Sequence, residues 1–170
     1  MTLKAEIALL IWLLVVIAYD FRKRRVPNWL VLSGAILALA ALAFGIQPFG
    51  TSWAAAFTGG AVGFGFLLLF YAVGFMGAGD VKFAGALGLW VGGWALVPIW
   101  VGASLLAGAH SVLWLTLQRW PWLPRLSLML SGRPSAGTDI NGSRQRARLV
   151  PYAAYLAVAT VAWMVWGRQR

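Results

Sequence analysis

One short segment decides how this chain folds, because it separates two long apolar runs and puts a carboxylate between them: Gly74-Phe75-Met76-Gly77-Ala78-Gly79-Asp80-Val81-Lys82. The residues before it, 54–73, are apolar enough to span a lipid bilayer. Its three glycines favour a turn, since glycine tolerates backbone conformations that other residues resist. We therefore expect Asp80 at the start of a helix, where free backbone amides and the helix dipole stabilise its charge.

The composition predicts an integral membrane protein and disfavours a water-soluble globule. Of the 170 residues, 61% are hydrophobic, and the formal net charge is +10. The basic residues lie between apolar runs, which favours contact with anionic membrane lipids and argues against binding to nucleic acid. The chain has no cysteine, so it offers no disulfide framework and no thiolate metal site. We expect neither a metal nor a cofactor.

Six apolar runs predict an all-α, polytopic membrane protein, a bundle of about six transmembrane helices in one domain over residues 1–170. The fourth and fifth runs are divided near Gly92, Gly93 and Pro98, and one very long helix is the alternative. Glycines in the third run predict close approach to another helix. The six runs lie at about 3–19, 29–44, 53–73, 81–94, 98–117 and 150–166.

The basic residues also predict the orientation of the chain. Four of them, Arg22 to Arg25, follow the first run, and an arginine-rich loop at about 118–149 follows the fifth. The positive-inside rule assigns both loops to the cytoplasm and the N-terminus to the outside. Pro27 favours a break before the second run. Asp20 and Asp80 are then both expected at the cytoplasmic ends of their spans.

Asp20 and Asp80 are two of only four acidic residues in the chain. A carboxylate near hydrocarbon is costly, which makes each of them a functional hypothesis. Two carboxyls held close together cannot both ionise easily, so one keeps a proton while the other accepts one, as the activation of water requires. The alternatives are an interfacial ion pair of Asp20 with Arg22 or Lys23 and a helix cap at Asp80.

Three blocks of sequence resemble the type IV prepilin peptidases, which are intramembrane aspartic proteases of the GxGD kind. The resemblance implies that Asp20 and Asp80 are the catalytic pair. It also implies cleavage of leaders from prepilin or pseudopilin precursors at the cytoplasmic face of a bacterial inner membrane. Tyr19-Asp20 matches the presenilin branch as well, but that branch's later Pro-Ala-Leu motif is missing. The three blocks are Asp20 with Val26-Pro27-Asn28, then Gly77-Ala78-Gly79-Asp80-Val81-Lys82, then Val150-Pro151-Tyr152-Ala153.

Larger members of that family carry a cysteine-containing cytoplasmic segment and also methylate the new N-terminus. This chain has no cysteine and a short first loop, so it is similar to the small, peptidase-only branch of the Flp or tight-adherence type. We expect no methyltransferase activity. Six further residues are predicted to shape the site or bind substrate: Gly77, Gly79, Lys82, Pro27, Pro151 and Tyr152.

Several of these residues have a second interpretation. Lys82 either steers a charge near Asp80 or marks the inner membrane boundary, and the second is favoured. Pro151 is expected as the first residue of the last helix, and Tyr152 is either a site residue or an interfacial anchor. For the whole chain, the rival functions are a small proton-coupled carrier that uses the same two aspartates and a noncatalytic assembly factor. Two acids on one membrane face form a poor transmembrane relay.

Overall fold

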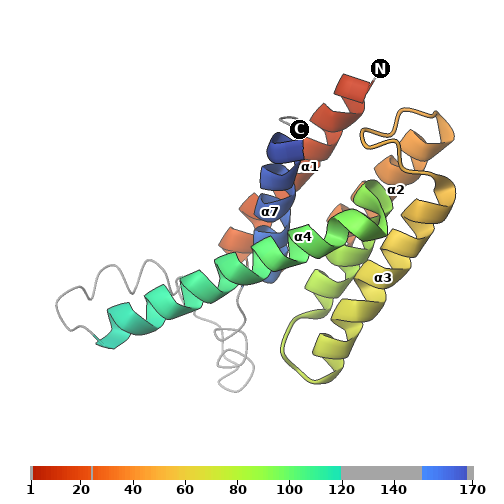
Figure 1. Ribbon diagram of the computed structural model, residues 1–170. Helices are drawn as coiled ribbons and strands as arrows, with labels where there is room; N and C mark the ends of the chain where they lie inside the picture. The colour runs from red at the N-terminus through yellow and green to blue at the C-terminus, as the bar shows by residue number, and fades with distance from the viewer. Residues whose placement is uncertain (1, 24, 120–150, 168–170) are drawn as a thin grey trace.

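The computed structural model describes residues 2–23, 25–119 and 151–167, and the regular elements in these ranges are all helices (Figure 1). The predicted all-α class is therefore confirmed for this part of the chain. Nearly all of the predicted basic loop at 118–149 lies outside the described residues. The helices are α1 (Thr2–Lys23), α2 (Asn28–Ala43), α3 (Trp53–Ala72), α4 (Ala78–Arg119) and α7 (Tyr152–Gly167).

The first helix is longer than expected, because α1 continues past Asp20 to Lys23. Arg22 and Lys23 form its last turn, where cations interact favourably with the carbonyl end of the helix dipole. The predicted break at Pro27 is confirmed. Pro27 has extended backbone angles (φ −70°, ψ 148°) and caps α2, and its carbonyl accepts hydrogen bonds from the amides of Leu30 and Val31.

Helix α4 has a kink, and the stretch before the kink is too short to cross a membrane. The expected count of six membrane spans is therefore not supported. Helix α4 contains one residue with non-helical angles, Gly92 (φ 75°, ψ 172°), at which two helical stretches meet in a kink. Figure 1 shows the change of direction within α4. The part before the bend, Ala78 to Val91, is roughly 20 Å long at 1.5 Å per residue, short of the hydrocarbon thickness of about 30 Å. The predicted division near Gly92 is confirmed, because two helical stretches of α4 meet there at a kink.

The glycines of α3 let this helix lie very close to α4, as predicted from their spacing. Gly59 and Gly63 are buried. A Cβ atom added at Gly59 would overlap the backbone of Gly88 and Gly92, and one at Gly63 would overlap the backbone of Ala84. Small residues permit such backbone contact and maximise van der Waals packing between the helices.

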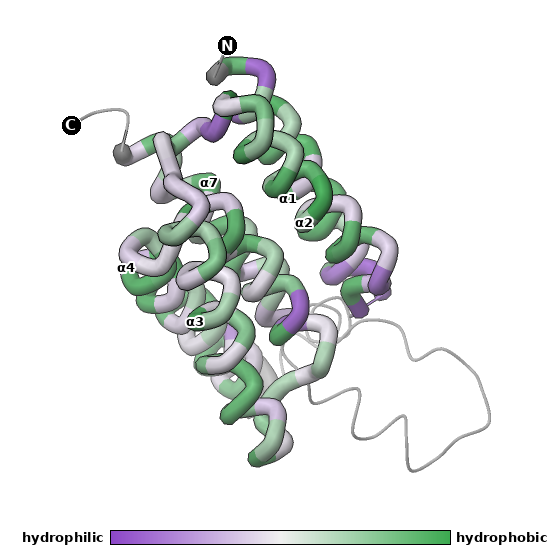
Figure 2. The backbone as a smooth tube through the Cα atoms, turned by 90° about the vertical axis from the view of Figure 1, so that its right-hand side faces the viewer, coloured by the Kyte–Doolittle hydropathy of each residue, from purple (hydrophilic) through white to green (hydrophobic). Residues whose placement is uncertain are grey.

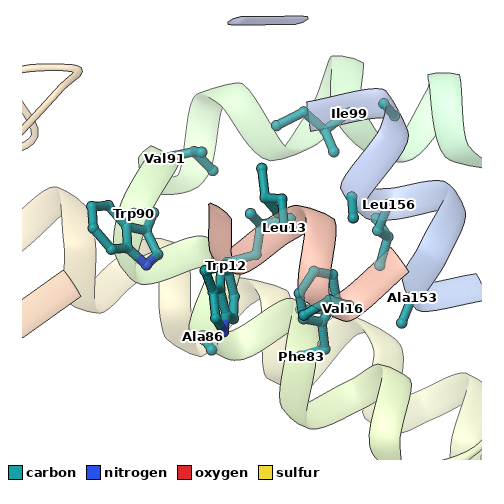
Figure 3. Packing of buried hydrophobic residues seen from close by; sticks show 14 of the residues in the cluster. Trp12, Leu13, Val16, Phe83, Ala86, Trp90, Val91, Ile99, Ala153 and Leu156 are labelled. Carbon is teal, nitrogen blue, oxygen red and sulfur yellow. The ribbon is translucent and has the colours of Figure 1, made fainter. Parts of the chain in front are cut away.

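The core lies where α1, α4 and α7 meet (Figure 3). Leu13 and Val16 of α1, Phe83 of α4 and Leu156 of α7 are completely buried. Helix α2 is joined to this core through two buried indoles. The Nε1 of Trp12 donates to the carbonyl of Leu30 at 2.8 Å, and that of Trp90 donates to the carbonyl of Gly34 at 3.0 Å.

Apolar side chains cover much of the outer surface of these helices. Within the described residues, two helices are long and apolar enough to cross a membrane, α3 and the Ala78–Thr116 part of α4, whereas Asn28–Ala43 and Tyr152–Trp166 are apolar but shorter. Only 22% of the most apolar stretch of α3 is buried. Along the chain, the most hydrophilic residues gather toward the helix ends (Figure 2).

The contact between α3 and α4 gives a direct test of this packing. In Gly88→Ala the new methyl group meets the carbonyl of Gly59, and we expect the free energy of unfolding to fall by about 1–3 kcal/mol, as for other overpacked sites. Gly65→Ala is the matched control, because a Cβ there meets nothing within 4 Å. Thermal unfolding in detergent should show a lower midpoint for Gly88→Ala alone, and equal midpoints for the two variants would contradict the packing.

Candidate functional site

Asp80 lies in the first turn of α4, as expected from the glycine-rich segment. Its amide donates to the carbonyl of Gly77 at 3.1 Å, and its Oδ2 accepts a hydrogen bond from the amide of Gly77 at 3.3 Å. This reciprocal pair resembles a capping box, with the carboxylate reaching back to the residue that precedes the helix. The side chain is therefore held close to the helix start.

Asp20 lies near the C-terminal end of α1, whereas Asp80 lies at the N-terminal end of α4. Its side chain is almost completely buried, with 3% of its surface exposed. The carbonyl end of a helix disfavours a negative charge, so the stabilisation of an Asp20 carboxylate must come from elsewhere. The structure supplies one strong donor, because the amide of Ala154 donates to Asp20 Oδ2 at 2.8 Å.

The start of α7 joins the two aspartates. The amide of Ala153 donates to Asp80 Oδ1 at 3.0 Å, and the next amide, of Ala154, donates to Asp20. Neighbouring backbone nitrogens in a helix are roughly 3 Å apart, so the two bound oxygens lie within about 9 Å of each other. Residues that are 60 positions apart in sequence numbering, 20 and 80, therefore share one binding element.

These amides are available because of where α7 begins. The first amide that bonds within the helix is that of Tyr155, which donates to the carbonyl of Pro151 at 3.4 Å. The amides of the three residues before Tyr155 thus have no intrahelical acceptor. Pro151 precedes α7, which begins at Tyr152, so the expectation that Pro151 is the first helical residue is wrong by one position. Proline has no backbone N–H, but the helix loses no hydrogen bond, because neither the first helical residue nor the residue before it donates within the helix.

Sequence reasoning did not identify Ala153 and Ala154 as functional residues, because their contribution comes from the backbone. Their side chains are methyl groups and carry no chemical signal. The sequence signal that could have indicated these amides is Pro151 followed by an apolar run. This pattern indicates the start of a helix, where the first amides have no acceptor within the helix.

Tyr152, the first residue of α7, contacts the second part of α4. Its hydroxyl lies 3.2 Å from Ser104 Oγ in a hydrogen bond, and its ring is close enough to Asp80 for an electrostatic interaction. Tyr152 therefore links the bent part of α4 to the end of α7 that holds both carboxylates.

Lys82 points away from the aspartates. Two residues along a helix correspond to a rotation of about 200°, and the Nζ of Lys82 donates to Asn28 Oδ1 at 3.1 Å. Asn28 follows Pro27 at the start of α2. Lys82 and Pro27 thus lie on the α2 side of α4, whereas Asp80, Pro151 and Tyr152 lie on the α7 side.

The three glycines before Asp80 differ in what they contribute. Gly74 has a positive φ of 84°, but Gly77 and Gly79 do not, so the predicted need for unusual backbone angles holds only at Gly74. A Cβ at Gly77 would lie 3.6 Å from Asp80 Oδ2, and one at Gly79 would lie 3.5 Å from the backbone of Val26. Both distances are ordinary contacts, so Gly77 lies beside the carboxylate of Asp80, whereas Gly79 lies beside Val26.

The arrangement brings together two carboxyl groups, of which Asp20 is almost completely buried and Asp80 partly buried, and supports them with one helix N-terminus. Their negative charges repel each other. Close carboxyls that are partly removed from water do not both ionise readily, which favours a state with a single shared proton. Among the described residues, no three His, Asp or Glu side chains gather as a metal site would require. The chemistry that this pair itself can perform is proton transfer.

The hydrogen bond from α7 to Asp20 can be tested by removing its donor. Ala154→Pro deletes an amide that makes no intrahelical bond, and proline is tolerated in the first turn of a helix. We expect a loss of about 1–3 kcal/mol in the free energy of unfolding, since a buried acceptor loses its partner. Ala54→Pro, in the first turn of α3, is the control and should change the chemical-denaturation midpoint much less. Equal losses in both variants would show that the bond contributes little.

Comparison of the sequence with models of known protein families gave a match. A family model described as the type IV leader peptidase family matches residues 7–113, a range that contains both aspartates. Neither the curated proteins nor the solved structures gave a match. Since the match covers more than half of the chain, this protein belongs to the type IV leader peptidase family.

Proposed function

We propose that this protein is an intramembrane aspartic endopeptidase that removes the leader from type IV prepilin or pseudopilin precursors. The observation that carries the proposal is the pairing of Asp20 and Asp80 on consecutive amides of α7. Membership of a peptidase family supports the reaction class. The precursor substrate comes from the resemblance of the three sequence blocks and is part of the proposal.

In the proposed reaction, one aspartate is ionised and removes a proton from a water molecule while the water oxygen attacks the scissile carbonyl carbon. The other aspartate is protonated and polarises the carbonyl oxygen. The proton then passes to the leaving amine as the C–N bond breaks, and the pair returns to its starting state. Because the two titrations are coupled, the acid and base roles belong to the pair and not to one residue.

The start of α7 supports this cycle electrostatically. Its free amides and the positive end of its dipole favour one net negative charge on the pair. This stabilisation is present before the substrate arrives, so the protein does not have to reorganise during the reaction. Gly77 leaves room beside Asp80 for the backbone of the precursor, and Tyr152 fixes the end of α7.

We further propose that the chain is a multi-pass protein of the bacterial inner membrane with its site at the cytoplasmic boundary. Large exposed apolar residues on all five helices support a lipid environment, since water-exposed patches of this extent are rare in soluble monomers. Arg22, Lys23 and Arg25 follow Asp20 and favour the cytoplasmic side for this end of α1. Peptidase activity without N-methylation belongs to the same proposal.

Removing either carboxylate tests the mechanism. Asp20→Asn and Asp80→Asn each remove one of the two groups that transfer protons. We expect the rate of cleavage of a purified prepilin in detergent to fall by about 10²–10⁴-fold in each variant. Glu6→Gln, which changes an acid at the far end of α1, is the control and should cleave at the normal rate. Cleavage products are followed by gel shift and by mass spectrometry of the new N-terminus.

Two results would reject the aspartyl pair. One is cleavage that persists in either aspartate variant. The other is a wild-type protein that leaves prepilin intact but transports protons across the membrane of proteoliposomes. If this transport requires both aspartates, the result favours the proton-coupled carrier.

The proposed orientation is testable because the chain has no cysteine of its own. Phe44 and Phe75 are both highly exposed and lie at opposite ends of α3, in the turns before and after it. In intact cells, Phe44→Cys should react with a membrane-impermeant maleimide, whereas Phe75→Cys should react only after the inner membrane is opened. The reverse pattern would overturn the orientation without affecting the catalytic pair.

A further inference from the structure

A groove runs between α2 and α3 on the outer surface, with α4 as its floor. Its volume is about 610 Å³, within the range of small-molecule sites. Its walls are apolar over most of its length, formed by Val31 and Leu32 of α2 and by Phe57 and Phe64 of α3. The mechanism proposed above does not use this groove.

The polar groups of the groove are confined to one end. They are Asn28, the first residue of α2, and Lys82, near the start of α4. Both side chains are exposed. An ammonium group has three donors, and the hydrogen bond to Asn28 uses one of them, so Lys82 can still bind an anion. The groove thus has one cationic end and an apolar body.

The groove lies on the face of α4 opposite to the aspartates. At 100° per residue, Lys82, Gly85 and Leu89 fall within one stripe that is centred almost half a turn from Asp80. A peptide segment seated along this stripe would not bring a scissile bond to the carboxylates. The position therefore favours an occupant that is not the cleaved part of a substrate.

We propose that this groove binds one acyl chain of an anionic phospholipid, with the phosphate held by Lys82 and Asn28. The inference depends on the membrane location proposed above but not on proteolysis. Lys82 lies at the expected headgroup level, and the stripe from Lys82 to Leu89 extends about 10 Å along α4, which matches the upper part of a chain in a leaflet about 15 Å thick. Charge complementarity then selects anionic headgroups.

Native mass spectrometry of the purified full chain tests the headgroup contact. Wild-type protein should retain phosphatidylglycerol in preference to phosphatidylcholine of the same chain length, and Lys82→Gln should reduce this preference roughly fivefold, the effect expected for one cation at a membrane surface. Arg22→Gln, another exposed cation at the same end of the molecule, should keep the preference. Equal retention of the two lipids by wild type, or equal losses in both variants, would overturn the proposal.

A second variant tests the apolar body of the groove. Ala61 lines it and is exposed, so Ala61→Phe fills the space without entering the core and should abolish the preferential binding of phosphatidylglycerol. Ala54→Phe, on an exposed part of α3 outside the groove, should not. Soluble glycerophosphate, which has the headgroup without chains, should fail to compete, and successful competition would show a simple anion site.

A photoreactive group at Leu32 distinguishes a lipid from a protein occupant. We expect it to crosslink phosphatidylglycerol in membranes, and crosslinking to a precursor or to a second copy of the chain in place of lipid would overturn the proposal. Ala61 is not among the residues assigned to the peptidase site, so a loss of lipid binding with normal cleavage in Ala61→Phe separates this proposal from the proposed peptidase function.

Discussion

The structure depends on one constraint, the placement of two carboxylates at the free amides that begin α7. Asp80 and Asp20 come from different helices and repel each other, so hydrogen-bond donors beside both carboxylates lower the cost of holding them together. Consecutive amides of Ala153 and Ala154 supply these donors. Because these groups belong to the backbone, their positions are fixed by the helix itself, and three helices must pack correctly before the pair exists.

The packing of the glycine-rich helices determines where Asp80 can lie. Close contact between α3 and α4 at Gly59 and Gly88 fixes the first part of α4, and the bend at Gly92 redirects the second part toward α7. The bend frees carbonyls that a regular helix would bond, and the hydroxyl of Thr51 donates to one of them, on Trp90, at 3.3 Å. The bend therefore allows one helix to carry Asp80 and also to support α7 through Ser104.

The two faces of α4 have different surroundings, and this separation organises the rest of the molecule. Asp80 faces α7 and α1, where burial and like charge favour proton sharing. Lys82 faces α2 and the apolar groove, where its charge remains exposed. A spacing of two residues therefore places the carboxylate of Asp80 and the ammonium group of Lys82 on different faces of α4.

The sequence by itself determined the helical class and most helix limits, and it singled out Asp20 and Asp80 as candidate site residues, because hydrophobic runs, glycines and isolated acids are local signals. The tertiary structure alone decided that the second stretch of α4 turns at Gly92 so as to contact α7, and that Ala153 and Ala154 hold the aspartates. A bend in an apolar run leaves almost the same composition as two spans. A backbone amide has no side-chain signature, and its value as a donor depends on which distant carboxylate the packing brings to it.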